Sequence, residues 1–182
     1  MPPPVGNLEL AATSDILELA CSVEPYQATL VPEKREEVTT EGGLAMKGAS
    51  LEATAAAVAR LHDAGIRSAL FVDPDEDALR ASKELGVHAV ELHTGEYANS
   101  SGEEQACQLS RLEHASELAR TLGLDVHAGH GLTYENVAPV AAIEPLEELN
   151  IGHSIVSRAI FTGMESAVRD MAAIIHRARG SK

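Results

Sequence analysis

Residues 122–131 read Leu-Gly-Leu-Asp-Val-His-Ala-Gly-His-Gly, and this stretch decides the fold that the sequence predicts. A glycine ends a helical pattern, a short apolar run follows, and polar residues stand where that run finishes. Glycine at such a helix end supplies the left-handed residue that turns the chain back into a strand. The same joint occurs at Ala64-Gly65-Ile66 and at Leu85-Gly86-Val87. The repetition indicates consecutive βα units.

Short apolar runs alternate with longer amphipathic runs along the whole chain. The predicted strands are Asn7–Ala11, Gln27–Val31, Ser68–Val72, Ala89–His93, Asp125–Gly129 and Leu149–Gly152. The predicted helices are Asp15–Val23, Ser50–Asp63, Glu76–Leu85, Glu103–Leu122, Tyr134–Ala142 and Met164–Arg179. With 182 residues, 45% of them hydrophobic, the chain has the length and composition of one globular domain covering residues 1–182.

Polar and ionisable residues stand at the end of nearly every predicted strand. A barrel draws its site from many strand ends, whereas an open doubly wound sheet uses mainly one switch point. The pattern therefore favours a barrel. A complete (β/α)8 TIM barrel has eight strands and typically about 250 residues. Because only six strands are predicted, we expect an α/β fold of this kind that lacks about its first two βα units.

Charge and cysteine content limit the functions that the chain can have. The 28 acidic and 14 basic residues give a net charge of −14, which disfavours nucleic acid and anionic membranes as partners. An anionic substrate would need local backbone amides and helix N-termini. Cys21 and Cys107 form no CxxC pair, and no stretch approaches the ~20 apolar residues of a membrane span. We expect a reduced, cytoplasmic protein that is neither exported nor inserted into a membrane.

His130 lies between Gly129 and Gly131 at the end of a predicted strand. The two glycines allow a sharp bend and close approach of a ligand, which leaves the imidazole exposed as a general acid. The alternative is a loop histidine that caps the next helix. The flanking glycines favour the catalytic interpretation.

Two carboxylates interrupt apolar strands. Glu91 and His93 share one face of a strand, where Glu91 could stabilise a developing positive charge. The alternative is a Glu-His pair that only orients itself. Glu9 is a candidate base, and its alternative is an exposed edge position.

Two further segments resemble binding loops. At residues 150–154, Asn-Ile-Gly-His-Ser, a glycine-led turn into a short helix could present free N–H groups to an anion, or be a simple capped turn. Residues 32–43 form a charged loop longer than the usual ~2–6 residues, which is consistent with a lid or binding loop as well as with plain surface.

Four stretches together resemble the pyridoxine 5′-phosphate synthase family. They are Leu30–Leu44 (LVPEKREEVTTEGGL), Glu91–Gly95 (ELHTG), Ala128–Tyr134 (AGHGLTY) and Leu149–His153 (LNIGH). The resemblance covers the chain from about Gly6 to its C-terminus. It implies a (β/α)8 barrel that assembles as an octamer and needs neither a metal nor an organic cofactor.

The resemblance also implies a reaction and its residues. The family condenses 3-amino-2-oxopropyl phosphate with 1-deoxy-D-xylulose 5-phosphate, releasing inorganic phosphate and water. By position, Glu9 matches the proton acceptor, His130 the proton donor and Glu91 the transition-state stabiliser. The positions that contact substrate or its phosphate are Thr39, Gly131, Gly152 and His153. The family's Asn-x-Asp-His and His-x-Arg stretches have no match before Gly6, so we expect that part of the active site to be missing.

Two other functions compete with the synthase. A metal-dependent barrel hydrolase could draw its ligands from a set of five residues, namely His93, His127, His130, His153 and Glu91. A non-catalytic remnant would bind sugar phosphates without turnover. Bound metal would support the first, and phosphate-dependent thermal stabilisation without product would support the second.

Overall fold

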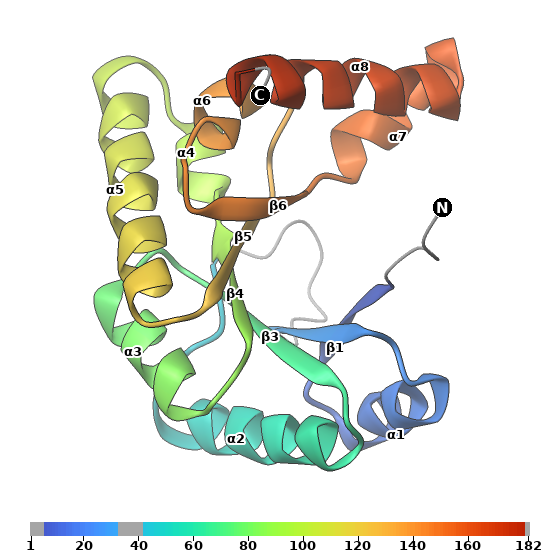
Figure 1. Cartoon of the computed structure of the whole chain (residues 1–182), viewed down its shortest axis with the longest axis vertical. Coiled ribbons are helices and arrows are strands. Elements are labelled where there is room, and N and C mark those ends of the chain that lie inside the picture. The colour runs from blue at the N-terminus through green and yellow to red at the C-terminus, as the bar shows by residue number, and fades with distance from the viewer. Residues whose placement is uncertain (1–5, 33–41, 181–182) are drawn as a thin grey trace.

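A computed structural model describes residues 6–32 and 42–180 of the chain. Its six strands form one parallel sheet in chain order (Figure 1). The strands are β1 (Asn7–Ala11), β2 (Gln27–Val31), β3 (Arg67–Val72), β4 (Ala89–His93), β5 (Asp125–Gly129) and β6 (Leu146–Asn150). Each strand pairs with the next one in sequence, so every connection is a crossover.

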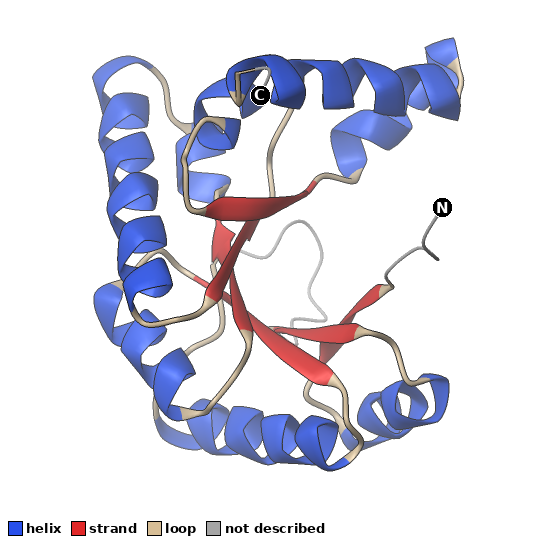
Figure 2. Cartoon of the chain, in the orientation of Figure 1, coloured by secondary structure: helices blue, strands red, loops and turns tan. Residues whose placement is uncertain are grey.

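The sheet curls, and the helices surround its outer side (Figure 2). The helices are α1 (Ser14–Val23), α2 (Gly48–Asp63), α3 (Glu76–Glu84), α4 (Gly95–Asn99), α5 (Gly102–Thr121), α6 (Val137–Ala141), α7 (His153–Thr162) and α8 (Met164–Ala178). This arrangement confirms the α/β class and a barrel-like curl. Among the described residues, no helix has the length and apolar character that crossing a bilayer requires.

One register row explains how the sheet holds its helices. The row crosses all six strands and consists entirely of buried aliphatic residues, namely Leu10, Leu30, Leu70, Val90, Val126 and Leu146. These residues belong to the hydrophobic core that also includes helix residues such as Leu61 and Leu112. Because side chains alternate along a strand, the residues between them point to the opposite, concave side. That side carries the polar groups of the fold.

Most predicted elements are confirmed, and the glycine joints are confirmed in detail. Gly65, Gly86 and Gly123 have φ values of +72°, +74° and +75°, in the left-handed region that glycine enters without strain. Four strands have the predicted bounds, and β3 begins one residue earlier than predicted.

The predicted last strand, Leu149–Gly152, was wrong by about three residues. The strand begins at Leu146 and includes the exposed Glu147 and Glu148. Two charged residues in a row are typical of a surface loop, so the sequence shows no strand pattern at this position. The predicted helix 134–142 is shorter because Asn136 accepts a hydrogen bond from the Thr133 N–H at 2.7 Å and holds a turn there. Helix α4 was not predicted.

We predict that Leu70→Ala strongly destabilises the chain, because Leu70 is fully buried in the central apolar row. The expected loss is roughly 3 kcal/mol in the free energy of unfolding, measured by urea denaturation. Leu19→Ala is the control, since Leu19 is 53% exposed on α1, and it should cost less than about 0.5 kcal/mol. Equal losses for the two variants would contradict the assigned core.

Candidate active site

A cavity of about 750 Å³ lies at the carboxyl ends of the strands. It contains all six predicted site residues that fall within the described ranges: Glu9, Glu91, His130, Gly131, Gly152 and His153. They come from β1, β4, the loop after β5 and the start of α7. The seventh predicted residue, Thr39, lies outside the described residues. The fold therefore brings together side chains that are up to 144 positions apart in sequence, from 9 to 153.

Glu91 is the most deeply buried carboxyl group of the cavity, with 4% of the residue exposed. Its Oε2 accepts a hydrogen bond from the Asn150 side-chain amide at 2.6 Å. The two residues meet across Gly129, where an added Cβ would lie 2.3 Å from Glu91 Oε1. Only glycine at 129 leaves the carboxyl group room to reach Asn150.

Burial disfavours the charged form of Glu91 and raises its pKa from an ordinary 4.5 to about 7. The Asn150 hydrogen bond opposes this shift, while the nearby Glu9 and Glu148 charges add to it. A carboxyl group that titrates near neutral pH can either release or accept a proton at little cost. Glu9, in contrast, is an exposed residue on the edge strand β1 that reaches the same cavity.

His130 has a strained backbone. Its φ of +82° is unusual for a residue with a side chain, and Gly131 follows with φ +76°. The buried Thr94 holds this turn: its hydroxyl donates to the carbonyl oxygens of Gly129 and His130, and its N–H donates to Gly129 at 2.9 Å. Desolvation, followed by the nearby His93, lowers the pKa of His130. The strain supports a functional interpretation over a simple helix cap.

The loop after β5 is fixed against its neighbours. A Cβ on Gly131 would lie 2.6 Å from the Cβ of Ala98 on α4, so glycine permits this close approach. The Ser154 hydroxyl, near the start of α7, donates to the Leu132 carbonyl oxygen at 2.9 Å. Gly152 precedes α7 and provides no side-chain cap for its free N–H groups. Because Gly152, His153 and Ser154 line the cavity, the first N–H groups of α7 lie beside it.

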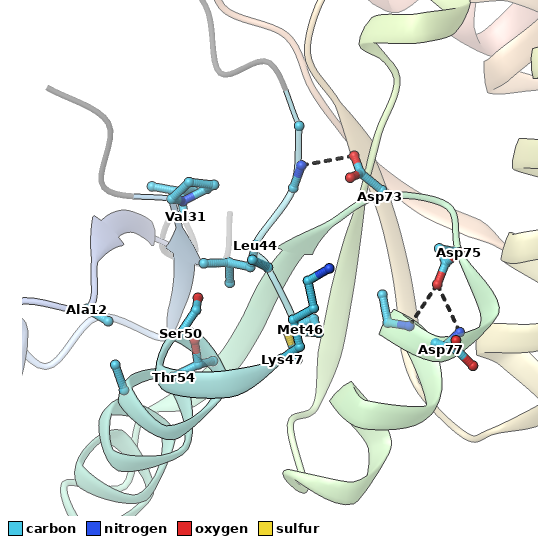
Figure 3. Close-up of a pocket in the computed structure, with 16 residues that line it drawn as sticks. Ala12, Val31, Leu44, Met46, Lys47, Ser50, Thr54, Asp73, Asp75 and Asp77 are labelled. Carbon is cyan, nitrogen blue, oxygen red and sulfur yellow. Dashed lines mark hydrogen bonds between the residues drawn. The ribbon is translucent and has the colours of Figure 1, made fainter. Parts of the chain in front are cut away.

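A second cavity, of about 780 Å³, lies between the starts of α2 and α3 (Figure 3). Its polar lining includes Lys47, Ser50 and Asp73. It is slightly larger than the first cavity but contains none of the predicted site residues, so size alone does not identify the active site. Asp73 lies on its wall and accepts a hydrogen bond from the Gly43 N–H at 2.9 Å, drawn as a dashed line in Figure 3.

The histidines and Glu91 considered above as metal ligands do not come together around one point in the described residues. In residues 6–32 and 42–180, no three His, Cys, Asp or Glu side chains are placed to hold a metal ion. His127 instead lies on β5, with its Nδ1 buried and lacking a partner among the described residues. The geometry thus gives no support to the metal-dependent hydrolase.

Three contributors to this region had no predicted role: Asn150, Thr94 and Asp73. The sequence places Asn150 and Asp73 among the polar residues at strand ends, but nothing local says what either one contacts. Thr94 follows the Glu-Leu-His run directly and could have been noticed only through its place in that motif.

The fold and the cavity define a parallel α/β protein whose strand ends gather carboxyl and imidazole groups, an arrangement suited to general acid–base chemistry. Residues 5–177 match the family described as the pyridoxal phosphate biosynthesis protein PdxJ. The chain therefore belongs to that family.

Curated relatives agree with this assignment. The chain is 52% identical over 173 residues to a pyridoxine 5′-phosphate synthase of Zymomonas mobilis, covering 95% of this chain and 67% of the relative. It is 53% identical over 173 residues to the protein of the same name from Synechococcus strain WH7803, covering 95% and 70%. The matched region thus spans about two thirds of each relative's length.

Solved structures share the fold at much lower identity. One is a HpcH/HpaI aldolase/citrate lyase family protein from Burkholderia cenocepacia, with 12% identity, a TM-score of 0.60, and coverage of 97% of this chain and 77% of that one. Another is a mandelate oxidase, with 11% identity, a TM-score of 0.62, and coverage of 95% and 56%. At these identities the likeness concerns the fold alone.

We predict that Glu91→Gln makes the stability of the chain less dependent on pH. The folded-state pKa of Glu91 is raised, so the folded chain holds this proton more tightly than the unfolded chain. The contribution of Glu91 to stability is therefore fully present below pH 4.5 and is lost as the pH rises to about 7. Glutamine can still accept from Asn150 but cannot ionise. The variant should gain on the order of 3 kcal/mol relative to the native chain between pH 4.5 and 8.

Urea denaturation at several pH values measures this difference. Glu113→Gln is the control, because Glu113 is exposed on α5 and is not among the groups that shift the pKa of Glu91, and it should keep the pH dependence of the native chain. A difference between Glu91→Gln and the native chain that stays constant with pH would show that Glu91 is not held in its protonated form by burial.

Proposed function

We propose that this chain acts in pyridoxine 5′-phosphate synthesis, condensing 3-amino-2-oxopropyl phosphate with 1-deoxy-D-xylulose 5-phosphate and releasing inorganic phosphate and water. The observation that carries the proposal is the convergence of six predicted site residues on one cavity in a chain of this family. Imine formation, elimination and ring closure are proton-transfer steps, which positioned carboxyl and imidazole groups serve.

In this proposal three residues handle protons. Glu9 accepts a proton from the substrate. Its exposed position on β1 leaves it in contact with solvent, to which it can release that proton before the next turnover. His130 donates a proton, and a lowered pKa makes its protonated form a stronger acid. Glu91 stabilises positive charge as it develops on an iminium group, because a buried carboxylate interacts strongly with a nearby cation.

The phosphate groups need a positive site in a protein of net charge −14. The start of α7 supplies one, because its unpaired N–H groups and helix dipole favour an anion. Gly152 and His153 lie at this helix start, and Gly131 lies on the facing loop of the same cavity. We assign Thr39 a substrate contact by the family resemblance alone.

The remaining features of the proposal follow from the family. The catalytic unit uses no metal and no organic cofactor, works as a homo-oligomer that is an octamer in the family, and acts in the cytoplasm without nucleic acid or membrane. Its architecture is a single eight-stranded (β/α)8 barrel domain to which the six described strands contribute. The curl of the sheet, with β1 and β6 each paired on one side only among the described residues, supports this architecture.

Product formation tests the proposal. The purified chain is given both phosphorylated substrates, and pyridoxine 5′-phosphate is detected by chromatography. Glu91→Gln and His130→Asn should each lower kcat by at least about a hundredfold, the range that acid–base residues contribute. His114→Asn is the control, because His114 is exposed on α5, away from the cavity, and it should keep native activity.

The non-catalytic alternative makes a different prediction for the same sample. A binding remnant would gain thermal stability from the two substrates, or from inorganic phosphate, while forming no product. That outcome, or native activity in His130→Asn, would contradict the proposed roles.

A further inference from the structure

Three aromatic rings form a cluster at the wall of the candidate cavity: Phe71 of β3, His93 of β4 and His130. The centroid of the His93 ring lies 5.1 Å from that of Phe71 and 5.0 Å from that of His130. The centroids of Phe71 and His130 are 6.2 Å apart. Phe71 and His130 line the cavity, whereas His93 is only 7% exposed and contacts both of these rings.

A single carboxylate oxygen orients His93. Its Nδ1 lies 3.2 Å from Asp73 Oδ1, and the same oxygen accepts the Gly43 N–H at 2.9 Å. The His93 hydrogen bond, ahead of the opposing effect of burial, lowers the pKa of Asp73, so the carboxylate is ionised at neutral pH. A carboxylate only accepts hydrogen bonds, so the proton between the two side chains lies on His93 Nδ1.

The position of Asp73 is itself fixed. A Cβ on Gly43 would lie 2.3 Å from the Asp73 nitrogen, so the two backbones touch and only glycine fits. On the other side, Arg111 of α5 donates through Nε to the carbonyl oxygen of Pro74, at 3.1 Å, directly after Asp73. The same arginine forms an ion pair with Glu96 of α4 at 2.5 Å.

Within the described part of the chain, the ring of His93 makes no second hydrogen bond. Its Nε2 is buried with no hydrogen-bond partner among the described residues, and it faces Gly95, where a Cβ would lie 2.5 Å away. The Asp73 hydrogen bond is thus the polar contact that fixes which way the imidazole points. His130, on its strained backbone, rests against this ring.

We propose that Asp73 is a positioning residue that acts through His93 to set the orientation and the proton occupancy of His130. The proposal rests on the function proposed above for His130, but its structural part concerns this chain alone. The Asp73 carboxylate attracts positive charge on the His93 ring that it orients, and that charge lowers the pKa of the neighbouring His130. Among the residues that the structure describes, the other ionisable groups lining the same cavity as His130 are Glu9 of β1, Glu91 of β4 and His153 of α7.

The test follows the imidazole signals of the chain by NMR between pH 5 and 9, with His130 assigned by its loss in His130→Asn. Asp73→Ala removes both the charge and the acceptor, and Asp73→Asn removes the charge but keeps an oxygen for Gly43 and His93. Asp75→Ala is the matched control: Asp75 is two residues away and caps α3 by accepting from the N–H groups of Asp77 and Ala78.

We expect the titration midpoint of His130 to rise in Asp73→Ala and Asp73→Asn, and its chemical shift at fixed protonation to change only in Asp73→Ala. Asp75→Ala should lower the thermal midpoint of unfolding and leave His130 unchanged. In the synthesis assay, Asp73→Ala should lower kcat roughly tenfold to a hundredfold with little change in KM, as expected for a misplaced catalytic group. Asp73→Asn should recover part of that loss.

An unchanged His130 midpoint and shift in Asp73→Ala would overturn the proposal, as would an effect that Asp75→Ala reproduces. The NMR result does not require turnover. If the native chain forms no product while His130 responds to Asp73 as expected, the proposed function fails and the positioning role stands.

Discussion

The burial of the Glu91 carboxyl group on the concave side of the sheet is the constraint on which the rest of the site depends. A carboxyl group in this position needs a hydrogen-bond donor and space to reach it. Asn150 supplies the donor from β6, and the missing side chain of Gly129 supplies the space. The requirement therefore ties β4, β5 and β6 into one register, and it raises the pKa of Glu91 to about 7.

The two sides of the sheet have different roles: the convex side stabilises the fold, and the concave side carries the polar groups of the candidate site. The convex side packs a continuous aliphatic row, centred on Leu70 and Val90, against the surrounding helices. This packing allows the concave side to hold polar groups that contribute little to the core. Strain is concentrated at His130, where Thr94 holds a backbone conformation that an isolated turn would avoid. The free energy gained by burying the aliphatic row on the convex side thus offsets the cost of holding polar groups on the concave side.

The sequence predicts the local features of this molecule well because they arise from local physics. A glycine at a helix end predicts a residue with left-handed backbone, as at Gly86. A short apolar run that follows such a glycine predicts a buried strand, as in β4. The polar residues of the predicted strands also placed Glu91 in β4 and His130 directly after β5, and a parallel sheet brings the ends of its strands to one edge. The edge strand β6 was misplaced because its exposed Glu147 and Glu148 carry no apolar pattern.

Pairwise contacts between distant residues could not be predicted in the same way. Glu91 and Asn150 are 59 positions apart, and Asp73 and His93 are 20 positions apart. The register of the strands and the curl of the sheet decide which polar groups of neighbouring strands meet. A local sequence pattern predicts neither of these two properties. The same holds for Thr94, whose hydroxyl reaches a carbonyl group 36 positions away.

The account depends most directly on the protonation of Glu91, which can be measured by ¹³C NMR of its side-chain carboxyl carbon, assigned by its loss in Glu91→Gln. In the native chain the titration midpoint should lie near 7, and Asn150→Ala should raise it further, because the variant removes the hydrogen bond that favours the ionised form. A native midpoint at the ordinary glutamate value of 4.5, unaffected by Asn150→Ala, would contradict the buried Glu91–Asn150 pair and the site built around it.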